Sequence, residues 1–366
     1  MKLVEDPAKS GANSTWQESL KQAFRNSTDF ARFLDLPEPP VQASGLAAGQ
    51  SIGDASHILR SDRKLKPVAS AIGSEIANSF PLFVTREFAS RIRRSDWNDP
   101  LLKQVWVDAR EGIVTPGFLA DPVGDSQVEL ASGLLHKYHG RVLLVTTGAC
   151  AIHCRYCFRR HYPYSSAPKS IDEWEPALEA IAADGSIQEV ILSGGDPLSI
   201  VDSILSQLVN RLDRIPHLKR LRIHTRFPIV IPSRITSGFI EILTATRLSK
   251  WIVLHINHAN EVDDKVLHAI ERLRYSKANL LNQSVLLRGV NDDVDSLVKL
   301  SEILLEANVL PYYLHQLDPV QSAAHFEVPV AQGTQLVIEM AKKLPGFAVP
   351  KYVFEKSGEP NKTRIY

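Results

Sequence analysis

The segment CAIHCRYC, residues 150–157, directly follows the apolar run RVLLVT at residues 141–146. A second run, EVILS at residues 189–193, leads into Gly-Gly-Asp. Between the two runs, residues 171–183 have the apolar spacing of an amphipathic helix. Two β-branched runs separated by a helix predict a β/α/β unit with parallel strands and a right-handed crossover. This unit decides the fold.

The same alternation continues toward the C-terminus. Strands are expected at residues 141–146, 189–193, 220–224, 251–256, 280–286 and 310–314, and helices at residues 171–183, 200–214, 236–246, 262–274, 294–307 and 333–344. Six β/α units are too few to close an eight-stranded barrel. We therefore predict an α/β fold built on a partial (β/α)6 TIM-like barrel, with a helical extension at its N-terminus.

Composition shifts divide the chain into four expected segments. Residues 1–80 are predicted to form a helical extension, with a helix near residues 16–25, and a loose linker rich in Pro, Gly, Ser and Ala. Residues 81–135 are expected to be a helical lead-in, and residues 136–345 the barrel. Residues 346–366 form a separate C-terminal segment.

Charge and hydropathy exclude several classes of partner. The 366 residues carry 42 Lys and Arg against 41 Asp and Glu, so no strong field favours nucleic acid or an anionic membrane. No apolar stretch approaches the roughly 20 residues that cross a bilayer, and the first residues lack the apolar core of a secretion signal. We expect a cytoplasmic protein with a small-molecule substrate.

The chain has three cysteines, Cys150, Cys154 and Cys157, in a CxxxCxxC pattern. An odd, clustered set does not form a disulfide framework. Three thiolates on one loop can bind three irons of a cubane cluster and leave the fourth iron open. The alternatives are a structural zinc ion with His153 or His161 as fourth ligand, in a binding module without radical chemistry, and three buried structural cysteines.

Polar residues follow each predicted strand. Because parallel strands of a barrel end at one rim, these residues are expected to share one site. They are Cys150, Gly194-Gly195-Asp196, His224-Thr225-Arg226, His255 to His258, Arg288 to Asp292 and His315 to Asp318.

The cysteine pattern after the first strand, together with SGGDP at residues 193–197, resembles the radical S-adenosylmethionine superfamily. Within it, several motifs resemble the lysine 2,3-aminomutases, and most closely the branch that makes β-lysine for modifying elongation factor P. These motifs are RRHYPY, IHTRFP, HINHANE, NQSVLLRGVND, PYYLHQLD and GEPNKT. The resemblance covers about residues 80–366.

The resemblance implies a role for each matching residue. Cys150, Cys154 and Cys157 would bind a [4Fe-4S] cluster, and Lys362 would form a Schiff base with pyridoxal phosphate. Arg159 would bind the substrate carboxylate, although the adjacent Arg160 leaves this assignment open by one residue. Asp318 and Glu355 would bind the distal ammonium of lysine. Lys137, Tyr138 and Arg141 would surround pyridoxal phosphate, and Gly194, Gly195, Asp196, His255 and Gln283 would contact S-adenosylmethionine.

The implied reaction converts L-α-lysine to β-lysine, with a one-electron reductant such as flavodoxin or ferredoxin and a functional link to elongation factor P and its lysyl-ligase. Glu355 replaces the aspartate of the free-lysine enzymes and His315 replaces their tyrosine, which favours the elongation factor P branch. An aminomutase acting on another amino acid, such as glutamate, is the rival within the same chemistry. The acidic pair argues against glutamate.

Overall fold

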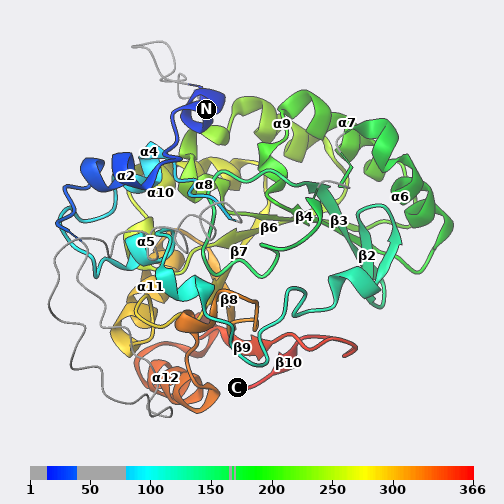
Figure 1. The fold of residues 1–366 in the computed structure, drawn as a ribbon. Helices are drawn as coiled ribbons and strands as arrows, with labels where there is room; N and C mark the ends of the chain where they lie inside the picture. Colours follow the sequence, from blue (N-terminus) through cyan, green and yellow to red (C-terminus); the bar gives the residue numbers. More distant parts are fainter. Residues whose placement is uncertain (1–14, 39–79, 165–166, 169) are drawn as a thin grey trace, which may run out of the picture.

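The computed structural model describes residues 15–38, 80–164, 167–168 and 170–366, and in this part of the chain ten strands form one sheet in the order β1 to β10. Figure 1 shows the helices along the outside of the curved sheet. Most of the expected linker falls within residues 39–79, which lie outside the described residues. No described helix has the length and apolar character needed to cross a membrane.

The predicted parallel strands and their helices are present, which confirms the α/β fold. The strands are β3 (Arg141–Thr147), β4 (Glu189–Gly194), β5 (Arg220–Thr225), β6 (Ser249–His255), β7 (Asn279–Val285) and β8 (Leu310–His315), each paired in parallel with the next. The helices are α6 (Ile171–Ala183), α7 (Asp202–Asp213), α9 (Ser237–Ala245), α10 (Asp264–Tyr275), α11 (Val294–Glu306) and α12 (Val330–Lys343).

Four further strands extend the sheet beyond the predicted six. At one edge, β2 (Leu134–Tyr138) pairs antiparallel with β3, and β1 (Glu129–Ala131) pairs antiparallel with β2. β1 and the first two residues of β2 lie in the segment expected to be helical. At the other edge, β9 (Lys351–Phe354) adds parallel to β8, and the short β10 (Thr363–Arg364) pairs antiparallel with β9. These strands are two to five residues long, too short for a clear alternation of apolar and polar residues.

Four of the six barrel helices begin at a residue whose side chain caps them, whereas α7 and α12 have no such cap. Ser170 caps α6, Thr236 caps α9, Asp263 caps α10 and Asp293 caps α11, each through a side-chain oxygen that accepts a backbone N–H. The caps fix the starting residue of these four helices, and the apolar stripe that follows fixes the face that packs on the sheet.

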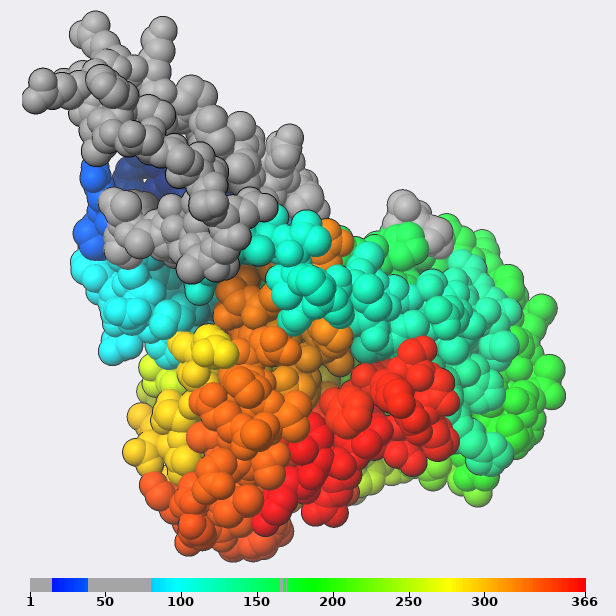
Figure 2. All heavy atoms as spheres, turned by 60° about the horizontal axis from the view of Figure 1, so that its bottom comes forward, coloured from blue at the N-terminus to red at the C-terminus, as the bar shows by residue number. Residues whose placement is uncertain are grey.

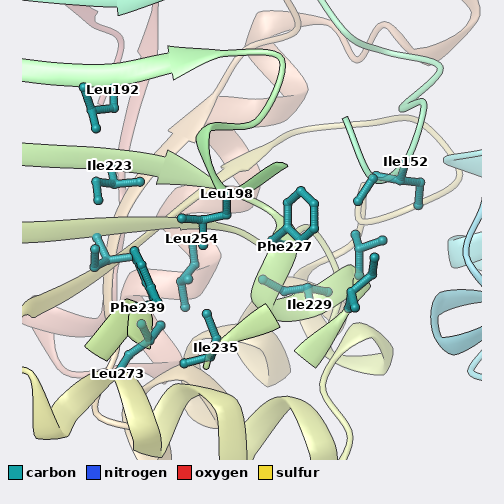
Figure 3. Close-up of a cluster of buried hydrophobic side chains, with 14 of the residues drawn as sticks. Ile152, Leu192, Leu198, Ile223, Phe227, Ile229, Ile235, Phe239, Leu254 and Leu273 are labelled. Carbon is teal, nitrogen blue, oxygen red and sulfur yellow. The ribbon is translucent and has the colours of Figure 1, made fainter. Parts of the chain in front are cut away.

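Alternation along the strands separates the core from the site. Leu192 on β4, Ile223 on β5 and Leu254 on β6 are buried and face the helices, where they approach Phe239 of α9 and Leu273 of α10 (Figure 3). Because successive side chains of a strand point to opposite faces, the neighbouring residues point into the concave side.

The N-terminal part packs on the barrel with short helices. The expected helix at residues 16–25 is α1 (Trp16–Lys21), followed by α2 (Ser27–Phe33). The expected helical lead-in contains the single turns α4 (Arg86–Ala89) and α5 (Pro100–Lys103), followed by the 3-10 helix η2 (Ala109–Gly112). Glu111 in η2 is fully buried against two arginines of the cysteine loop, so this part of the chain supports that loop.

Gly333 in α12 provides a test of the packing that holds β9 in place. A Cβ there would lie 2.6 Å from Cζ of Tyr352 on β9 and 2.8 Å from Cδ2 of Leu286. We predict that Gly333→Ala lowers the free energy of unfolding by about 1–3 kcal/mol, because overpacking forces α12 away from the sheet. Urea denaturation measures the change. Gly185→Ala is the control, since nothing lies within 4 Å of its Cβ position, and an equal loss in both variants would contradict the prediction.

Candidate active site

The concave side of the sheet contains a cavity of about 380 Å³. Inward-facing side chains of five consecutive strands line it: Ser193 of β4, His224 of β5, His255 of β6, Gln283 of β7 and His315 of β8. The cavity also contains nine of the residues that the sequence assigned to one site: Lys137, Tyr138, Arg141, Arg159, His255, Gln283, Asp318, Glu355 and Lys362.

Five charged side chains of alternating sign form a chain along the cavity. Lys362 pairs with Glu355, whose other oxygen lies 2.9 Å from Nζ of Lys137. Lys137 pairs with Asp125 at 2.6 Å, and Asp125 accepts a hydrogen bond from Nε of Arg159 at 2.7 Å. Figure 2 shows the C-terminal segment, in red, against the turquoise region that contains β2. This row of charged side chains therefore connects the C-terminal edge of the sheet with the edge that contains β2.

The two carboxylates expected to act as a pair have opposite environments. Burial raises the pKa of Glu355, but Lys362 and Lys137 outweigh burial and lower it to about 2. Burial raises the pKa of Asp318 to about 7, although Lys362 partly opposes the shift and Glu355 adds to it. Glu355 therefore carries a compensated charge, whereas Asp318 needs a cation to stay ionised at neutral pH.

The structure distinguishes the two adjacent arginines of the cysteine loop. Arg159 lines the cavity and donates to Asp125 and, at 3.1 Å, to Oγ of Ser193. Arg160 points away and pairs with the buried Glu111 at 2.7 Å, which Arg155 also contacts. Arg159 is thus the arginine available to a ligand, and Arg160 has a structural role.

Several polar atoms of the cavity wall are buried and have no hydrogen-bond partner among the described residues. They are Nε of Arg141, Nε2 of His224 and Nε2 of His315. Burial lowers the pKa of both histidines well below the usual value, so both imidazoles are neutral. Arg141 also lies 4.7 Å over the ring of Tyr138. Unpaired buried polar groups are costly, so this wall fits a polar ligand such as pyridoxal phosphate.

The three cysteines lie on the loop after β3, all free and half-buried. Burial and the neighbouring thiols raise the pKa of Cys150 well above its usual value and that of Cys157 to about 11. Among the described residues, no three His, Cys, Asp or Glu side chains already converge as around a metal ion. The fit to an iron–sulfur cluster therefore rests on three soft thiolate donors in one loop.

Both histidines considered as a fourth zinc ligand have other partners. Nδ1 of His153 lies 2.7 Å from the carbonyl oxygen of Pro81, and its ring stacks on Phe80 at 4.7 Å. Nε2 of His161 lies 3.4 Å from the carbonyl oxygen of Gln321. Each contact uses one ring nitrogen, and among the described residues neither imidazole belongs to a cluster of three His, Cys, Asp or Glu side chains.

The Gly-Gly-Asp turn after β4 is not part of the cavity wall. Gly194 has φ +116°, and a Cβ on Gly195 would lie 2.8 Å from the carbonyl carbon of Ala149, just before the first cysteine. Asp196 is buried and accepts from Leu198 N, Thr225 Oγ1 and Arg226 N, and its pKa is raised by burial to about 6. The turn thus packs directly on the cysteine loop. Its contact with S-adenosylmethionine stays a prediction.

His255 and Gln283, the other two expected contacts of that cofactor, do line the cavity. Nε2 of His255 lies 2.9 Å from Nε2 of Gln283, and burial lowers the pKa of His255 to about 3. The neutral imidazole and the amide offer both donors and acceptors to a ligand.

Sequence analysis missed several functional candidates. Asp125 was assigned to a lead-in segment, and a single acid after a glycine gives no signal of burial. Arg222 on β5 and the Tyr312–Tyr313 pair on β8 also line the cavity. Arg222 lies two residues before His224 on the same strand. Because alternate residues of a strand share a face, this spacing predicts that both side chains point to the same side of the sheet.

The fold and the cysteine loop together define a radical S-adenosylmethionine enzyme. The sequence model described as "Radical SAM superfamily" matches residues 144–300, from β3 to α11. The chain is 46% identical over 348 residues to "L-lysine 2,3-aminomutase" of Haemophilus influenzae, covering 95% of this chain and 94% of that protein. It is 47% identical over 293 residues to the Escherichia coli protein of that name, covering 80% and 85%.

A more distant relative of the same name, from Clostridium subterminale, is 33% identical over 80% of this chain and 70% of its own length. The chain belongs to the L-lysine 2,3-aminomutase family, whose members are isomerases. Membership implies three cofactors: a [4Fe-4S] cluster, S-adenosylmethionine and pyridoxal phosphate.

The raised pKa of Asp318 predicts a pH dependence of stability. Between about pH 4 and pH 7 the folded carboxyl keeps a proton that the unfolded carboxyl has lost, so this group lowers stability as pH rises through that window. We predict that Asp318→Asn removes this loss. The free energy of unfolding of the variant, relative to that of the parent, should therefore rise by on the order of 2 kcal/mol between pH 4.5 and pH 8. Urea unfolding at both pH values measures it. The exposed Asp264→Asn is the control, and a parallel pH response in parent and Asp318→Asn would refute the assignment.

Proposed function

We propose that the protein is a radical S-adenosylmethionine, pyridoxal phosphate-dependent 2,3-aminomutase that converts L-α-lysine to β-lysine. The observation that carries the proposal is that one cavity holds Lys362, an arginine two residues after Cys157, and the carboxylates of Asp318 and Glu355. A lysine substrate needs these groups together, because it has a carboxylate at one end and an ammonium at the other.

The bound cofactors would supply the substrate radical, through the cluster and S-adenosylmethionine, and the carrier for the migrating amino group, through pyridoxal phosphate. Lys362 is the amine that attaches the carrier. Lys137, Tyr138 and Arg141 lie along the adjacent wall and supply positive charge and hydrogen-bond donors toward its phosphate. The orphaned Nε of Arg141 is one such donor.

Arg159 binds the substrate carboxylate in this proposal. Its Nε is fixed by Asp125 and its Nη1 by Ser193, so the guanidinium is held in one orientation. A fixed planar donor suits a carboxylate better than a mobile ammonium does. Asp125 acts on the substrate only through this orientation.

Asp318 and Glu355 select a substrate with a cationic tail. Asp318 has no ion-pair partner among the described residues, and a substrate ammonium would supply the cation that keeps it ionised at neutral pH. Glutamate would bring a second carboxylate to the same place and would be repelled. Glu355 pairs with both Lys137 and Lys362. When the Lys362 amine is bound to pyridoxal phosphate, it would release Glu355, and this carboxylate could then accept the substrate ammonium.

Two features support the elongation factor P branch. Glu355 replaces the shorter aspartate, and His315 lines the cavity with its ring 5.5 Å from that of Tyr313. We propose that the product serves the modification of elongation factor P through its lysyl-ligase. A cytoplasmic one-electron reductant, flavodoxin or ferredoxin, would supply the electron.

The first test replaces the amine that would hold pyridoxal phosphate. We predict that Lys362→Ala abolishes β-lysine formation and the visible absorption of bound pyridoxal phosphate, while iron and sulfide contents match those of the parent. Chromatographic analysis of lysine isomers measures the product. The exposed Lys356→Ala should retain both signals. Full mutase activity in Lys362→Ala would sink the proposal.

The second test separates Arg159 from its neighbour. We predict that Arg159→Lys raises KM for lysine roughly 10- to 100-fold, because a charged hydrogen bond contributes about 1.5–3 kcal/mol and lysine loses the bidentate geometry. Pyridoxal phosphate binding should be retained. Arg160→Lys should lower stability through Glu111 and leave KM close to the parental value. The reverse pattern would assign the carboxylate to Arg160.

A further inference from the structure

Arg226, in the motif IHTRFP, has no role in the reaction described above, yet it contacts a cysteine of the loop. It follows β5 and caps the short helix α8 (Phe227–Val230). Its Nη1 lies 2.7 Å from Sγ of Cys154. Arg226 is 5% exposed, and Cys154 is half-buried.

Two side chains bind the guanidinium, and a third binds the backbone of Arg226. Nη2 donates to Oε2 of Glu261 at 2.8 Å and to Oε1 of Gln104 at 2.6 Å, and the backbone N–H of Arg226 donates to Asp196 at 2.7 Å. The planar group also lies between two rings, 5.3 Å from Phe88 and 5.8 Å from Tyr156. A side chain held in this way cannot turn away from Cys154 without breaking several buried contacts.

Glu261 is itself fully buried, and both of its carboxylate oxygens accept hydrogen bonds. Its Oε1 accepts the backbone N–H groups of Asn257 and His258 at 2.9 and 3.0 Å, and its Oε2 faces Arg226. Glu261 therefore provides one negative charge on the side of the guanidinium remote from the thiol. The order of groups is carboxylate, guanidinium, sulfur.

We propose that Arg226 is a positioning residue that donates an N–H hydrogen bond to the Cys154 thiolate and thereby sets the reduction potential of the cluster, with Glu261 moderating its charge. This inference rests on the proposed function, in which Cys154 binds a [4Fe-4S] cluster. Reduction adds one electron to the cluster and makes it more negative. A buried cation that donates to a ligand sulfur stabilises the reduced form more than the oxidised form. Arg226 thus makes the cluster easier to reduce.

The charge order gives two variants with shifts of opposite sign. Arg226→Gln removes the cation and should move the midpoint potential to a more negative value. Glu261→Gln removes the opposing charge, leaves the guanidinium in place and should move the potential to a more positive value. Arg226→Lys keeps the charge with a shorter reach, and its potential should lie between those of Arg226→Gln and the parent.

The experiment is an anaerobic redox titration of the reconstituted full chain, followed by the EPR signal of the reduced cluster, with iron and sulfide assayed in the same samples. Arg211→Gln is the control for loss of a distant positive charge, because Arg211 lies on α7 and pairs with Glu175. Its potential should equal that of the parent.

The outcomes separate the two claims. A parent chain without iron and sulfide would overturn the proposed function. A parent chain with a cluster, but with equal potentials in all variants or with Arg226→Gln and Glu261→Gln shifted in the same direction, would overturn the role of Arg226. If Arg226→Gln fails to retain a cluster, the signs of the shifts in Glu261→Gln and Arg226→Lys decide the question.

Discussion

The ion pair between Lys137 and Glu355 connects the two edge regions of the sheet. Lys137 lies on β2, near one edge of the sheet, and Glu355 follows β9, near the other. No backbone pairing joins these edges among the described strands, so the barrel closes on this side through charged side chains. Replacing either partner would leave its buried counterpart with one ion pair in place of two, Glu355 with Lys362 or Lys137 with Asp125, which is costly in a low-dielectric site. Lys362 depends on the same pair, because Glu355 holds both lysines.

The cavity shows how environment gives different properties to similar groups. Asp318 and Glu355 are both carboxylates on the wall of one cavity, yet the pKa of one is raised to about 7 and that of the other lowered to about 2. Proximity to two lysines makes the difference. His224, His255 and His315 are all neutral for the same reason that Asp318 is protonated more easily, since burial disfavours whichever form carries charge. The wall thus combines fixed charges with neutral donors and acceptors.

The sequence predicted the elements with strong periodicity. The six parallel strands and their helices follow from runs of alternating or amphipathic residues. Nine of the assigned residues lie in one cavity. The common rim of parallel strands accounts for those that follow a strand, such as Asp318 after β8, whereas Lys137 and Tyr138 lie on the antiparallel β2 and Arg141 begins β3. The strands β1, β2, β9 and β10 were missed because they are short and depend on pairing with strands already in place. Asp125 and the Arg226 contact with Cys154 were missed because the contacting residues are far apart in sequence, and pairing across such distances leaves no local pattern.

The choice between Arg159 and Arg160 shows where sequence reasoning stops. Both arginines follow the third cysteine, and no local pattern separates them. Glu111, more than forty residues earlier, decides the outcome: its buried carboxylate binds Arg155 and Arg160 and leaves Arg159 to point into the cavity beside Asp125. The short helices that precede the barrel therefore do more than cover it. Through one carboxylate that pairs with two guanidinium groups of the cysteine loop, they determine which arginine can reach a ligand. The loop is thus held from outside the segment at residues 144–300 as well as by the Gly-Gly-Asp turn and Arg226 within that segment.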